Sequence, residues 1–247
     1  MKCLILAGGF GTRLYPSTLN QAKALLEYKG KPIISHIVDK VPQHIDIMIS
    51  TNKKFEADFH QWQQKTNREV EILVEDPELS SGLNECQKLG AVGSLNFWIE
   101  KRQIAEDLLV IAGDNYFEFN LAQFISRYDG KHAMVAVHNI GNKDKACQFG
   151  VVQLDGDRIA EFQEKPARPK SSLVATACYI FPRRIFPLLH RYCQQGKKDN
   201  LGNFIAYLVD RDEVQSYCFS EYWIDIGSKS PLLPLYKRGS KGDCSSN

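Results

Sequence analysis

The sequence predicts an α/β fold with a mixed, mostly parallel central sheet flanked by helices, followed by a strand-rich second half. Two observations lead to this prediction. Short apolar runs alternate with helical patterns through the first half of the chain, and apolar runs dominate much of the second half. Alternation of this kind is typical of parallel sheets that helices cover on both faces. With 247 residues, the chain can bury a sizeable core as one large domain or as two closely joined domains.

The expected elements follow from the apolar runs in chain order. The run at residues 3–7 is the first expected strand, and it stops at a glycine-rich loop. Further strands are expected at 45–50, 70–74 and 108–112, separated by helical patterns at 33–40, 54–65 and 92–101. In the second half, strands are expected at 133–137, 149–154, 158–163, 173–181 and 214–219, with helices at 183–194 and 203–210. Asp155-Gly156 predicts a hairpin turn, and residues 239–247 are expected to form a disordered tail.

Composition argues against several classes of partner. Lys and Arg number 31 and Asp and Glu 29, a formal charge of +2, so no polyanion-binding surface is indicated and nucleic acid is not an expected partner. The seven cysteines show no CxxC pair or zinc-like spacing, which favours reduced thiols in a cytoplasmic protein over a disulfide framework. The longest apolar run near the N-terminus is about five residues, too short for a signal-peptide core or a membrane span. We therefore expect a soluble, cytoplasmic protein that does not enter a membrane.

The glycine-rich segment CLILAGGFGTRL is the most informative stretch of the chain. Gly8, Gly9 and Gly11 remove side chains from the turn after the first strand, so backbone amides can approach an anion. A dinucleotide fingerprint would need a third glycine where Leu14 stands, and a Walker loop would need a Gly-Lys-Ser/Thr sequence that is absent. Arg13 can grip two phosphate oxygens at once through its planar guanidinium group. The segment predicts a phosphate-binding loop, and a tight turn with a solvated arginine is the structural alternative.

A second polar segment, GDN at 113–115, follows the expected strand at 108–112. Ligands of parallel sheets bind beyond the carboxyl ends of the strands, so the glycine-rich loop and the GDN segment are expected to open onto one crevice. The carboxylate of Asp114 suits Mg²⁺, which prefers oxygen ligands and usually takes one or two of them from the protein.

Several motifs occur along the chain in a recognisable order. GGFGTRLYPSTLNQAK runs from Gly8 to Lys23, with Ala22 where a proline is usual, and is followed by LGAVGS at 89–94, GDN at 113–115, FGV at 149–151, EKP at 164–166 and WIDIG at 223–227. In this order and spacing, the chain resembles the sugar-1-phosphate nucleotidyltransferases, the family that contains glucose-1-phosphate thymidylyltransferase. The resemblance spans nearly the whole chain. It implies a Rossmann-like catalytic domain over residues 1–238, with a nucleotide-binding half at 1–128 and a sugar-phosphate-binding half at 129–238.

The resemblance also implies a reaction. A nucleoside triphosphate and a sugar 1-phosphate would give a nucleoside diphosphate sugar and pyrophosphate, by Mg²⁺-dependent in-line attack on the α-phosphate. The implied catalytic residues are Arg13 and Lys23, which would hold the triphosphate, Asp114, and Lys165, which would hold the sugar phosphate. The two implied Mg²⁺ ligands are Asp114 and Asp225. Without the resemblance, Asp225 would be interpreted as a turn or capping aspartate.

Substrate contacts are implied as two sets of residues. The nucleotide-binding set is Leu6, Ala7, Gly8, Gly9, Gly11, Thr12, Arg13, Lys23 and Gly90. The sugar-phosphate-binding set is Asn115, Gly150, Glu164, Lys165 and Tyr179. In the second set, the Glu164 carboxylate would accept hydrogen bonds from sugar hydroxyls. Two departures from the family bear on the choice of sugar, because Phe149 replaces a frequent tyrosine and Ala177 a frequent glycine.

The base and the sugar are less defined than the reaction. The side chain that usually reads the base lies upstream of Gly90, where the loop EDPELSSGLNECQK diverges from the family and leaves Glu85 or Gln87 as candidates. We expect dTTP or UTP with a glucose-like sugar 1-phosphate; the two bases share one imide edge, and the C5 methyl of thymine contributes only about 1 kcal/mol in an apolar contact. The chain ends soon after Asp225, so we expect a catalytic core that is a monomer or a homo-oligomer such as a dimer.

Two other functions fit parts of the pattern. A catalytically silent relative that binds nucleotide sugars as a regulatory subunit would be expected to have lost some of the charged set. That set is complete here and consists of Arg13, Lys23, Asp114, Lys165 and Asp225. A glycosyltransferase with a related nucleotide-binding fold is disfavoured, because Arg13 and Lys23 are positioned for a triphosphate that such an enzyme does not bind. We therefore expect an Mg²⁺-dependent enzyme.

Overall fold

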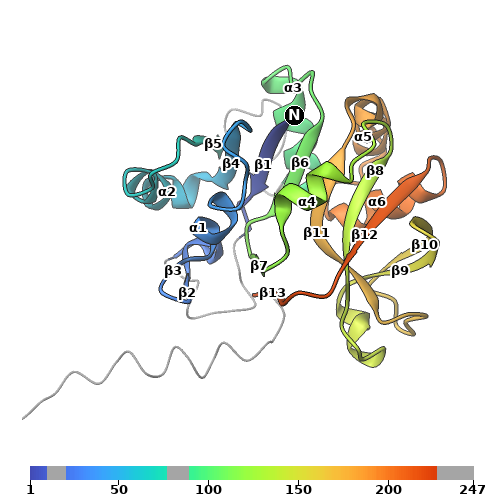
Figure 1. Ribbon diagram of the computed structural model, residues 1–247. Helices are drawn as coiled ribbons and strands as arrows, with labels where there is room; N and C mark the ends of the chain where they lie inside the picture. Colours follow the sequence, from blue (N-terminus) through green and yellow to red (C-terminus); the bar gives the residue numbers. More distant parts are fainter. Residues whose placement is uncertain (10–20, 77–88, 227–247) are drawn as a thin grey trace, which may run out of the picture.

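A nine-stranded sheet forms the centre of the structure, a computed structural model that describes residues 1–9, 21–76 and 89–226 (Figure 1). Its strands are β1 (Lys2–Leu6), β4 (Ile47–Asn52), β5 (Glu71–Glu75), β6 (Leu108–Ala112), β8 (Ala133–Asn139), β9 (Gly150–Asp155), β10 (Arg158–Glu164), β11 (Leu173–Phe181) and β12 (Val214–Phe219). Their order across the sheet is β5-β4-β1-β6-β11-β8-β12-β10-β9. Within this sheet, β10 and β11 run opposite to the other strands, so the expected mixed, mostly parallel sheet is confirmed.

The four strands from β5 to β6 are parallel, and three of them, β4, β1 and β6, are buried on both faces, whereas in the edge strand β5 only Leu73 is buried. The apolar runs of the three buried strands are therefore nearly continuous, and in β1 Leu4 faces one core cluster while Ile5 faces the other, both with no exposed surface. Because these strands are parallel, their carboxyl ends lie on one edge of the sheet. The segments that leave β1, β5 and β6 begin on that edge at Ala7, Asp76 and Gly113.

Helices cover both faces of the sheet (Figure 1). One face is covered by α1 (Ile33–Val38), α2 (Glu56–Gln63) and α4 (Leu121–Ser126). The other face is covered by α3 (Gly90–Lys101), α5 (Phe186–Gln194) and α6 (Leu201–Val209). The side chains of Asn120 and Asn200 accept hydrogen bonds from backbone N–H groups in the first turns of α4 and α6, which fixes where each helix begins. Short 3₁₀ helices lie at Lys23–Leu25, Lys53–Phe55, Asp144–Gln148 and Arg183–Ile185.

The second half of the chain extends the sheet with antiparallel pairs. β9 and β10 form the hairpin expected at Asp155-Gly156, where Gly156 has a φ of +59°. β11 pairs with both β6 and β8, and so joins the two halves of the chain in one sheet. The register of β11 against β8 shifts between Ala175 and Tyr179, which leaves Ala177 at a bulge in the middle of the strand.

Several short elements are absent from the sequence-based prediction. β2 (Glu27–Tyr28) pairs with β3 (Lys31–Pro32), and β7 (Asn115–Phe117) pairs with β13 (Trp223–Asp225). These strands and the six-residue helix α4 are too short to show a hydrophobic period. The expected longer elements are present, with ends that differ by a few residues because helix and strand ends have no sharp sequence signal.

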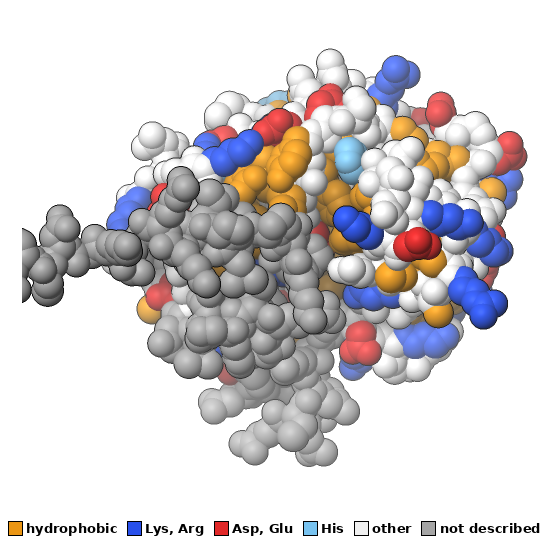
Figure 2. All heavy atoms as spheres, turned by 90° about the horizontal axis from the view of Figure 1, so that it is seen from below, with side chains coloured by type: hydrophobic (Ala, Val, Ile, Leu, Met, Phe, Trp, Pro, Cys, Tyr) orange, Lys and Arg blue, Asp and Glu red, His pale blue; other side chains and the backbone are white. Residues whose placement is uncertain are grey.

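The surface and the cysteines agree with the composition. Acidic and basic side chains are interspersed over the described part of the face seen in Figure 2. Among the described helices, none combines the length and the apolar character that a membrane span needs. The described cysteines carry free thiols and are Cys3, Cys147, Cys178, Cys193 and Cys218. Burial raises the pKa of the Cys3 and Cys178 thiols, so these two residues pack as small apolar groups.

Candidate active site

A cavity of about 940 Å³ opens at the carboxyl ends of β1, β5 and β6. The segment after β1 and the start of α3 form one side of its wall, and β9, β10, β11 and the start of α6 form the other. Its volume lies within the range of small-molecule binding sites. The crevice expected from the glycine-rich loop and the GDN segment therefore extends into the second half of the chain.

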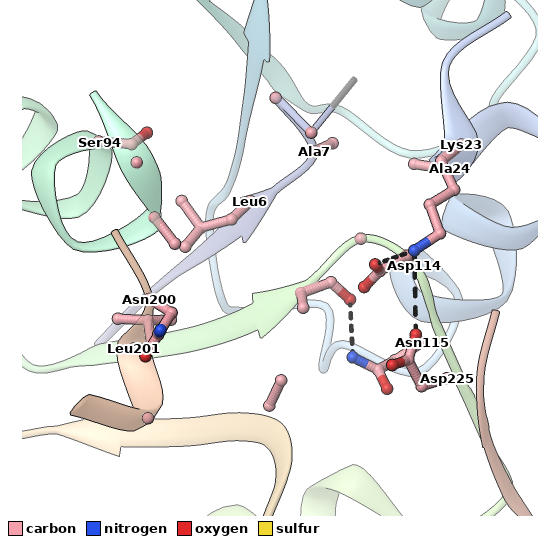
Figure 3. A pocket seen from close by; sticks show the side chains of 18 of the residues that line it. Leu6, Ala7, Lys23, Ala24, Ser94, Asp114, Asn115, Asn200, Leu201 and Asp225 are labelled. Carbon is pink, nitrogen blue, oxygen red and sulfur yellow. Dashed lines mark hydrogen bonds and ion pairs between the residues drawn. The ribbon is translucent and has the colours of Figure 1, made fainter. Parts of the chain in front are cut away.

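Lys23 lies between the two aspartates that the resemblance assigns to Mg²⁺ (Figure 3). Its Nζ atom is 2.5 Å from Oδ2 of Asp114 and 3.9 Å from Oδ1 of Asp225. The Lys23 side chain is 12% exposed, and the aspartate side chains are 33% and 28% exposed. The lysine thus offsets the mutual repulsion of two carboxylates that both line the cavity.

The β7–β13 ladder brings the two aspartates together. Asp114 precedes β7, Asp225 is paired with Asn115, and the N–H group of Ile226 donates to the carbonyl oxygen of Asp114 over 3.0 Å. Trp223 donates through Nε1 to Oδ1 of Asn115 over 2.9 Å, and Asn115 is only 3% exposed. Asn115, which the resemblance assigns to the sugar phosphate, therefore also fixes β13 against β7.

The two aspartates form a donor set that fits Mg²⁺. This ion is usually held by one or two carboxylates together with water and substrate phosphates. Within residues 1–9, 21–76 and 89–226, no group of three or more His, Cys, Asp or Glu residues is arranged to hold a metal ion. Asp114 and Asp225 therefore match a site that takes its remaining ligands from water and substrate, and they already share one positive charge from Lys23.

Glu164 and Lys165 lie in the part of the cavity that belongs to the second half of the chain. Nζ of Lys165 is 3.5 Å from Oε1 of Glu164. A Cβ atom on Gly202, at the start of α6, would lie 1.9 Å from Oε2 of Glu164, and one on Gly150 would lie 2.3 Å from the Phe162 ring. A side chain at Gly150 would therefore meet the Phe162 ring, and one at Gly202 would displace the Glu164 carboxylate.

Two residues that are not glycine have a positive φ in this part of the cavity, Lys165 at +47° and Ala177 at +55°. Such conformations are strained for L-residues and concentrate at functional sites. The bulge gives a physical reason for the glycine that the related family frequently carries at the position of Ala177. Tyr179 follows the bulge and is 4% exposed, and burial together with the nearby Glu164 carboxylate raises the pKa of its phenol.

Gly8 and Gly90 border the other part of the cavity. The carbonyl oxygen of Gly8 accepts a hydrogen bond from the side chain of Asn52 over 2.8 Å. Gly90 has a φ of +66°, and a Cβ atom there would lie 2.3 Å from the carbonyl oxygen of Lys198. The N–H groups in the first turn of α3 donate to the carbonyl oxygens of Lys198 and Asp199 over 2.7 to 3.1 Å. The start of α3 is therefore satisfied within the protein, and Gly90 serves as a point of close backbone approach.

The structure brings most of the predicted site residues to this one cavity. The predicted residues that line it are Leu6, Ala7, Gly8, Gly9, Lys23, Gly90, Asp114, Asn115, Gly150, Glu164, Lys165, Tyr179 and Asp225. The predicted residues that lie outside the described part of the chain are Gly11, Thr12, Arg13 and the two candidate base readers, Glu85 and Gln87.

The lining residues that the sequence does not single out include Glu75, Asn200 and Gly202. Glu75 ends β5, so the rule that ligands lie beyond the carboxyl ends of parallel strands points to it. Asn200 caps α6, which is a sequence signal for a helix start and not for a site. Gly202 has no sequence signal, because its role depends on the approach of α6 to Glu164.

Comparison with known sequences identifies the family. The family profile described as nucleotidyl transferase matches residues 2–238. The chain is 31% identical over 243 residues to the bifunctional protein GlmU of Methanocaldococcus jannaschii, covering 96% of this chain and 54% of that protein. It is 28% identical to a mannose-1-phosphate guanyltransferase of Debaryomyces hansenii, covering 94% of this chain and 63% of that protein. The chain thus spans about half the length of the curated GlmU proteins that it matches.

Solved structures agree with the sequence comparison. The chain superposes with a TM-score of 0.81 on a Bacillus anthracis protein assigned as a glucose-1-phosphate thymidylyltransferase, solved in complex with sucrose, at 27% identity and 98% coverage of both chains. A UDP-glucose pyrophosphorylase complexed with UDP-glucose shares the fold, with a TM-score of 0.74, 20% identity and coverage of 92% of this chain and 93% of that one. The motif order, the fold and the family profile agree, and this chain belongs to the nucleotidyl transferase family.

Proposed function

We propose that this chain transfers a nucleotidyl group from a nucleoside triphosphate to a sugar 1-phosphate, giving a nucleoside diphosphate sugar and pyrophosphate. The observation that carries the proposal is one cavity lined by the described members of both implied binding sets, with Lys23, Asp114 and Asp225 clustered at its wall. Membership of the nucleotidyl transferase family supports it. On this proposal, residues 1–128 bind the nucleotide and residues 129–238 bind the sugar phosphate.

In the proposed reaction, an oxygen of the sugar phosphate attacks the α-phosphorus of the triphosphate. The new phosphorus–oxygen bond forms in line with the bond that breaks, and pyrophosphate leaves with the electron pair. Lys165 holds the sugar phosphate, Lys23 neutralises charge on the triphosphate, and Arg13 holds the β and γ phosphates and the departing pyrophosphate. These residues contribute alignment and charge neutralisation, which are the main sources of catalysis in such transfers.

Asp114 and Asp225 are proposed to hold Mg²⁺, which when bound supplies positive charge beside the phosphates. Lys23 is placed between these carboxylates by contacts of 2.5 and 3.9 Å, and its side chain is 12% exposed. A cation whose position is already fixed needs little reorganisation when the triphosphate arrives, and this lowers the barrier to reaction.

The sugar is proposed to bind between β9, β10, β11 and α6. Glu164 accepts hydrogen bonds from sugar hydroxyls, because a carboxylate offers acceptors only and the missing side chain of Gly202 leaves room for this one at the cavity wall. Gly150 brings backbone to the sugar without a side chain, and Tyr179 lines the same cavity. The methyl group of Ala177 borders this space and limits the bulk of the sugar that fits.

The substrates within this class remain part of the proposal. The motif resemblance favours dTTP or UTP with a glucose-like sugar 1-phosphate. Relatives include a mannose-1-phosphate guanyltransferase. For this chain, that similarity favours GTP with a mannose-like sugar 1-phosphate as the alternative pair. Mg²⁺ as cofactor, a cytoplasmic location and a monomeric or homo-oligomeric state belong to the same proposal.

Pyrophosphate release in the presence of Mg²⁺ tests the proposed function. Each ribonucleoside triphosphate and dTTP would be paired in turn with glucose, N-acetylglucosamine, mannose and fucose 1-phosphates. Release that requires both substrates is the expected result. Asp225→Asn is the matched control, since it keeps the side-chain volume and should lose turnover while its circular dichroism spectrum stays unchanged. No release with any pair, together with tight binding of a nucleotide sugar, would establish the catalytically silent relative in its place.

A further inference from the structure

The carboxylate of Glu75 lies in the part of the cavity that the proposed function gives to the nucleoside. Glu75 ends β5, which is two strands from β1 in the sheet, and its side chain reaches the segment that follows β1. A Cβ atom on Gly8 would lie 3.4 Å from each of the two carboxylate oxygens of Glu75. Any base that packs against the backbone of Gly8 therefore meets this carboxylate.

Buried donors hold the Glu75 carboxylate in one orientation. Ser50 of β4 donates through its hydroxyl to Oε1 over 2.5 Å, and Ser94 of α3 donates to the same oxygen. Trp98 donates through Nε1 to the Ser50 hydroxyl over 2.8 Å. Ser50, Ser94 and Trp98 are 0%, 4% and 2% exposed, so this arrangement belongs to the core. Oε1 is thereby occupied, whereas Oε2 accepts no hydrogen bond from any described residue.

The carboxylate is at the opposite end of the cavity from the charged cluster. Figure 3 shows Ser94 across the cavity from Lys23 and Asp114, with Ala7 between them. Since Ser94 bonds to Glu75, the Glu75 carboxylate lies at the end of the cavity away from the charged cluster. The end that holds Glu75 is therefore suited to the base.

The hydrogen-bonding edges of the bases differ in how well they suit an acceptor. Guanine presents two adjacent donors, N1–H and the N2 amino group, and the two lone pairs of Oε2 can accept from both. Adenine and cytosine present one amino donor beside a ring nitrogen with a lone pair. Uracil and thymine present one N–H donor between two carbonyl oxygens, and those oxygens would face the carboxylate at close range.

We propose that Glu75 selects the base and that the preferred nucleoside triphosphate is GTP. This inference rests on the proposed function, because it requires a nucleotide in the cavity. It differs from the dTTP or UTP that the motif resemblance favours, and it makes Glu75 the base-reading residue in place of Glu85 or Gln87. Ser50 and Ser94 act as positioning residues, since they orient the carboxylate and do not touch the base.

Glu75→Gln is the decisive variant, because it keeps the shape of the side chain and replaces one acceptor by a donor. The serine hydroxyls continue to donate to Oε1, so the amide Nε2 takes the place of Oε2 and faces the base. Equilibrium binding of GTP, ATP, CTP, UTP and dTTP with Mg²⁺ would be measured by titration calorimetry without sugar phosphate. The wild-type protein should bind GTP most tightly, and the variant should lose roughly ten- to a hundredfold of its preference for GTP over UTP.

Two further variants separate base selection from charge and from folding. Asp76→Asn removes a neighbouring carboxylate that also lines the cavity, and it should leave the ratio of GTP to UTP affinity unchanged. Glu75→Asp keeps the charge and withdraws it from the base, so GTP should bind more weakly but still better than UTP. Melting temperatures of all variants would identify any that do not fold.

The possible outcomes distinguish this inference from the proposed function. Binding of UTP or dTTP in preference to GTP, or a base ratio that Glu75→Gln leaves unchanged, would overturn the role of Glu75. Pyrophosphate release with some nucleotide and sugar pair would then still support the proposed function. Failure of the wild-type protein to bind any nucleoside triphosphate would overturn both.

Discussion

Replacing Ala177 with glycine should stabilise the protein, although the substitution shortens a side chain in the middle of a strand. Ala177 has a φ of +55° at the bulge of β11, and the left-handed region costs an L-residue about 1–2 kcal/mol. Glycine removes this strain, but its freedom in the unfolded chain lowers stability by about 0.5–1 kcal/mol. Part of the roughly 0.8 kcal/mol that a buried methyl group contributes is also lost, because the Ala177 methyl group is partly buried against the core. The net gain is roughly 0.5 kcal/mol, which corresponds to about 1–2 °C in melting temperature for a chain of this size.

Ala175 on the same strand provides the matched control. It also lines the cavity, is 8% exposed, pairs with Val137 in regular register and has no positive φ. Ala175→Gly therefore removes a buried methyl group, about 0.8 kcal/mol, and adds the same cost in the unfolded state. Urea unfolding followed by circular dichroism would measure both variants. The strain argument is refuted if Ala177→Gly lowers stability as Ala175→Gly does.

The same substitution tests the position of the sugar. Removing the Ala177 methyl group enlarges the sugar side of the cavity and leaves the nucleotide side unchanged. The KM for sugar 1-phosphates with bulky substituents should fall, by roughly tenfold where the methyl group blocks one carbon of the substrate. The KM for the nucleoside triphosphate should stay the same. A change confined to the nucleotide KM would mean that Ala177 borders a different part of the substrates.

Three other substitutions test the remaining parts of the site. Lys23→Met leaves two carboxylates facing each other, so thermal stability should fall without Mg²⁺ and recover with it, while pyrophosphate release stays lost. Gly202→Ala favours the helix but displaces the Glu164 carboxylate, so the KM for sugar 1-phosphate should rise by roughly tenfold or more and the nucleotide KM should not change. Trp223→Phe removes the donor to the buried Oδ1 of Asn115, which should cost about 1–3 kcal/mol in urea unfolding and weaken Mg²⁺-dependent turnover. Wild-type stability in this last variant would show that water replaces the indole N–H.

The parallel half of the fold is predictable because three of its four strands, β1, β4 and β6, are buried on both faces. β1 and β6 appear in the sequence as short apolar runs, and the loops that follow them carry glycine or polar residues. The β7–β13 ladder is different, because its strands have three residues each and show no period. The resemblance to a known family implied that Asp114 and Asp225 share a site, but their contact depends on pairing between segments far apart in the chain.

Ala177 and Glu75 show two physical limits of sequence interpretation. Ala177 is visible in the sequence as a departure from a glycine that is frequent in the family. Whether alanine raises or lowers the stability of the protein at this position depends on the φ angle, which the residue type does not determine. Glu75 is the first residue of the segment EDPELSSGLNECQK, but nothing in the sequence distinguishes it there from Glu85 or Gln87. Its neighbour in space is Gly8, and that contact follows from the order β5-β4-β1, which requires knowledge of the strand pairing.

The cluster of Lys23, Asp114 and Asp225 links the arrangement of the site to its proposed reaction. One lysine and two aspartates have a formal charge of −1, which favours the binding of a divalent cation to the carboxylates. With that cation bound, the cluster would have a formal charge of +1, which favours the binding of a triphosphate. Lys23 is closer to Asp114, at 2.5 Å, than to Asp225, at 3.9 Å, so a cation competes with the lysine mainly at Asp114. On the proposed function, Lys23 would stabilise the carboxylate pair in the absence of Mg²⁺ and would face the phosphates of the triphosphate, from nearly the same position, when the aspartates hold Mg²⁺. Mg²⁺ can offset the repulsion between the two carboxylates, but it cannot replace the lysine beside the phosphates. With Mg²⁺ present, the Lys23→Met variant should therefore regain its thermal stability but not its turnover.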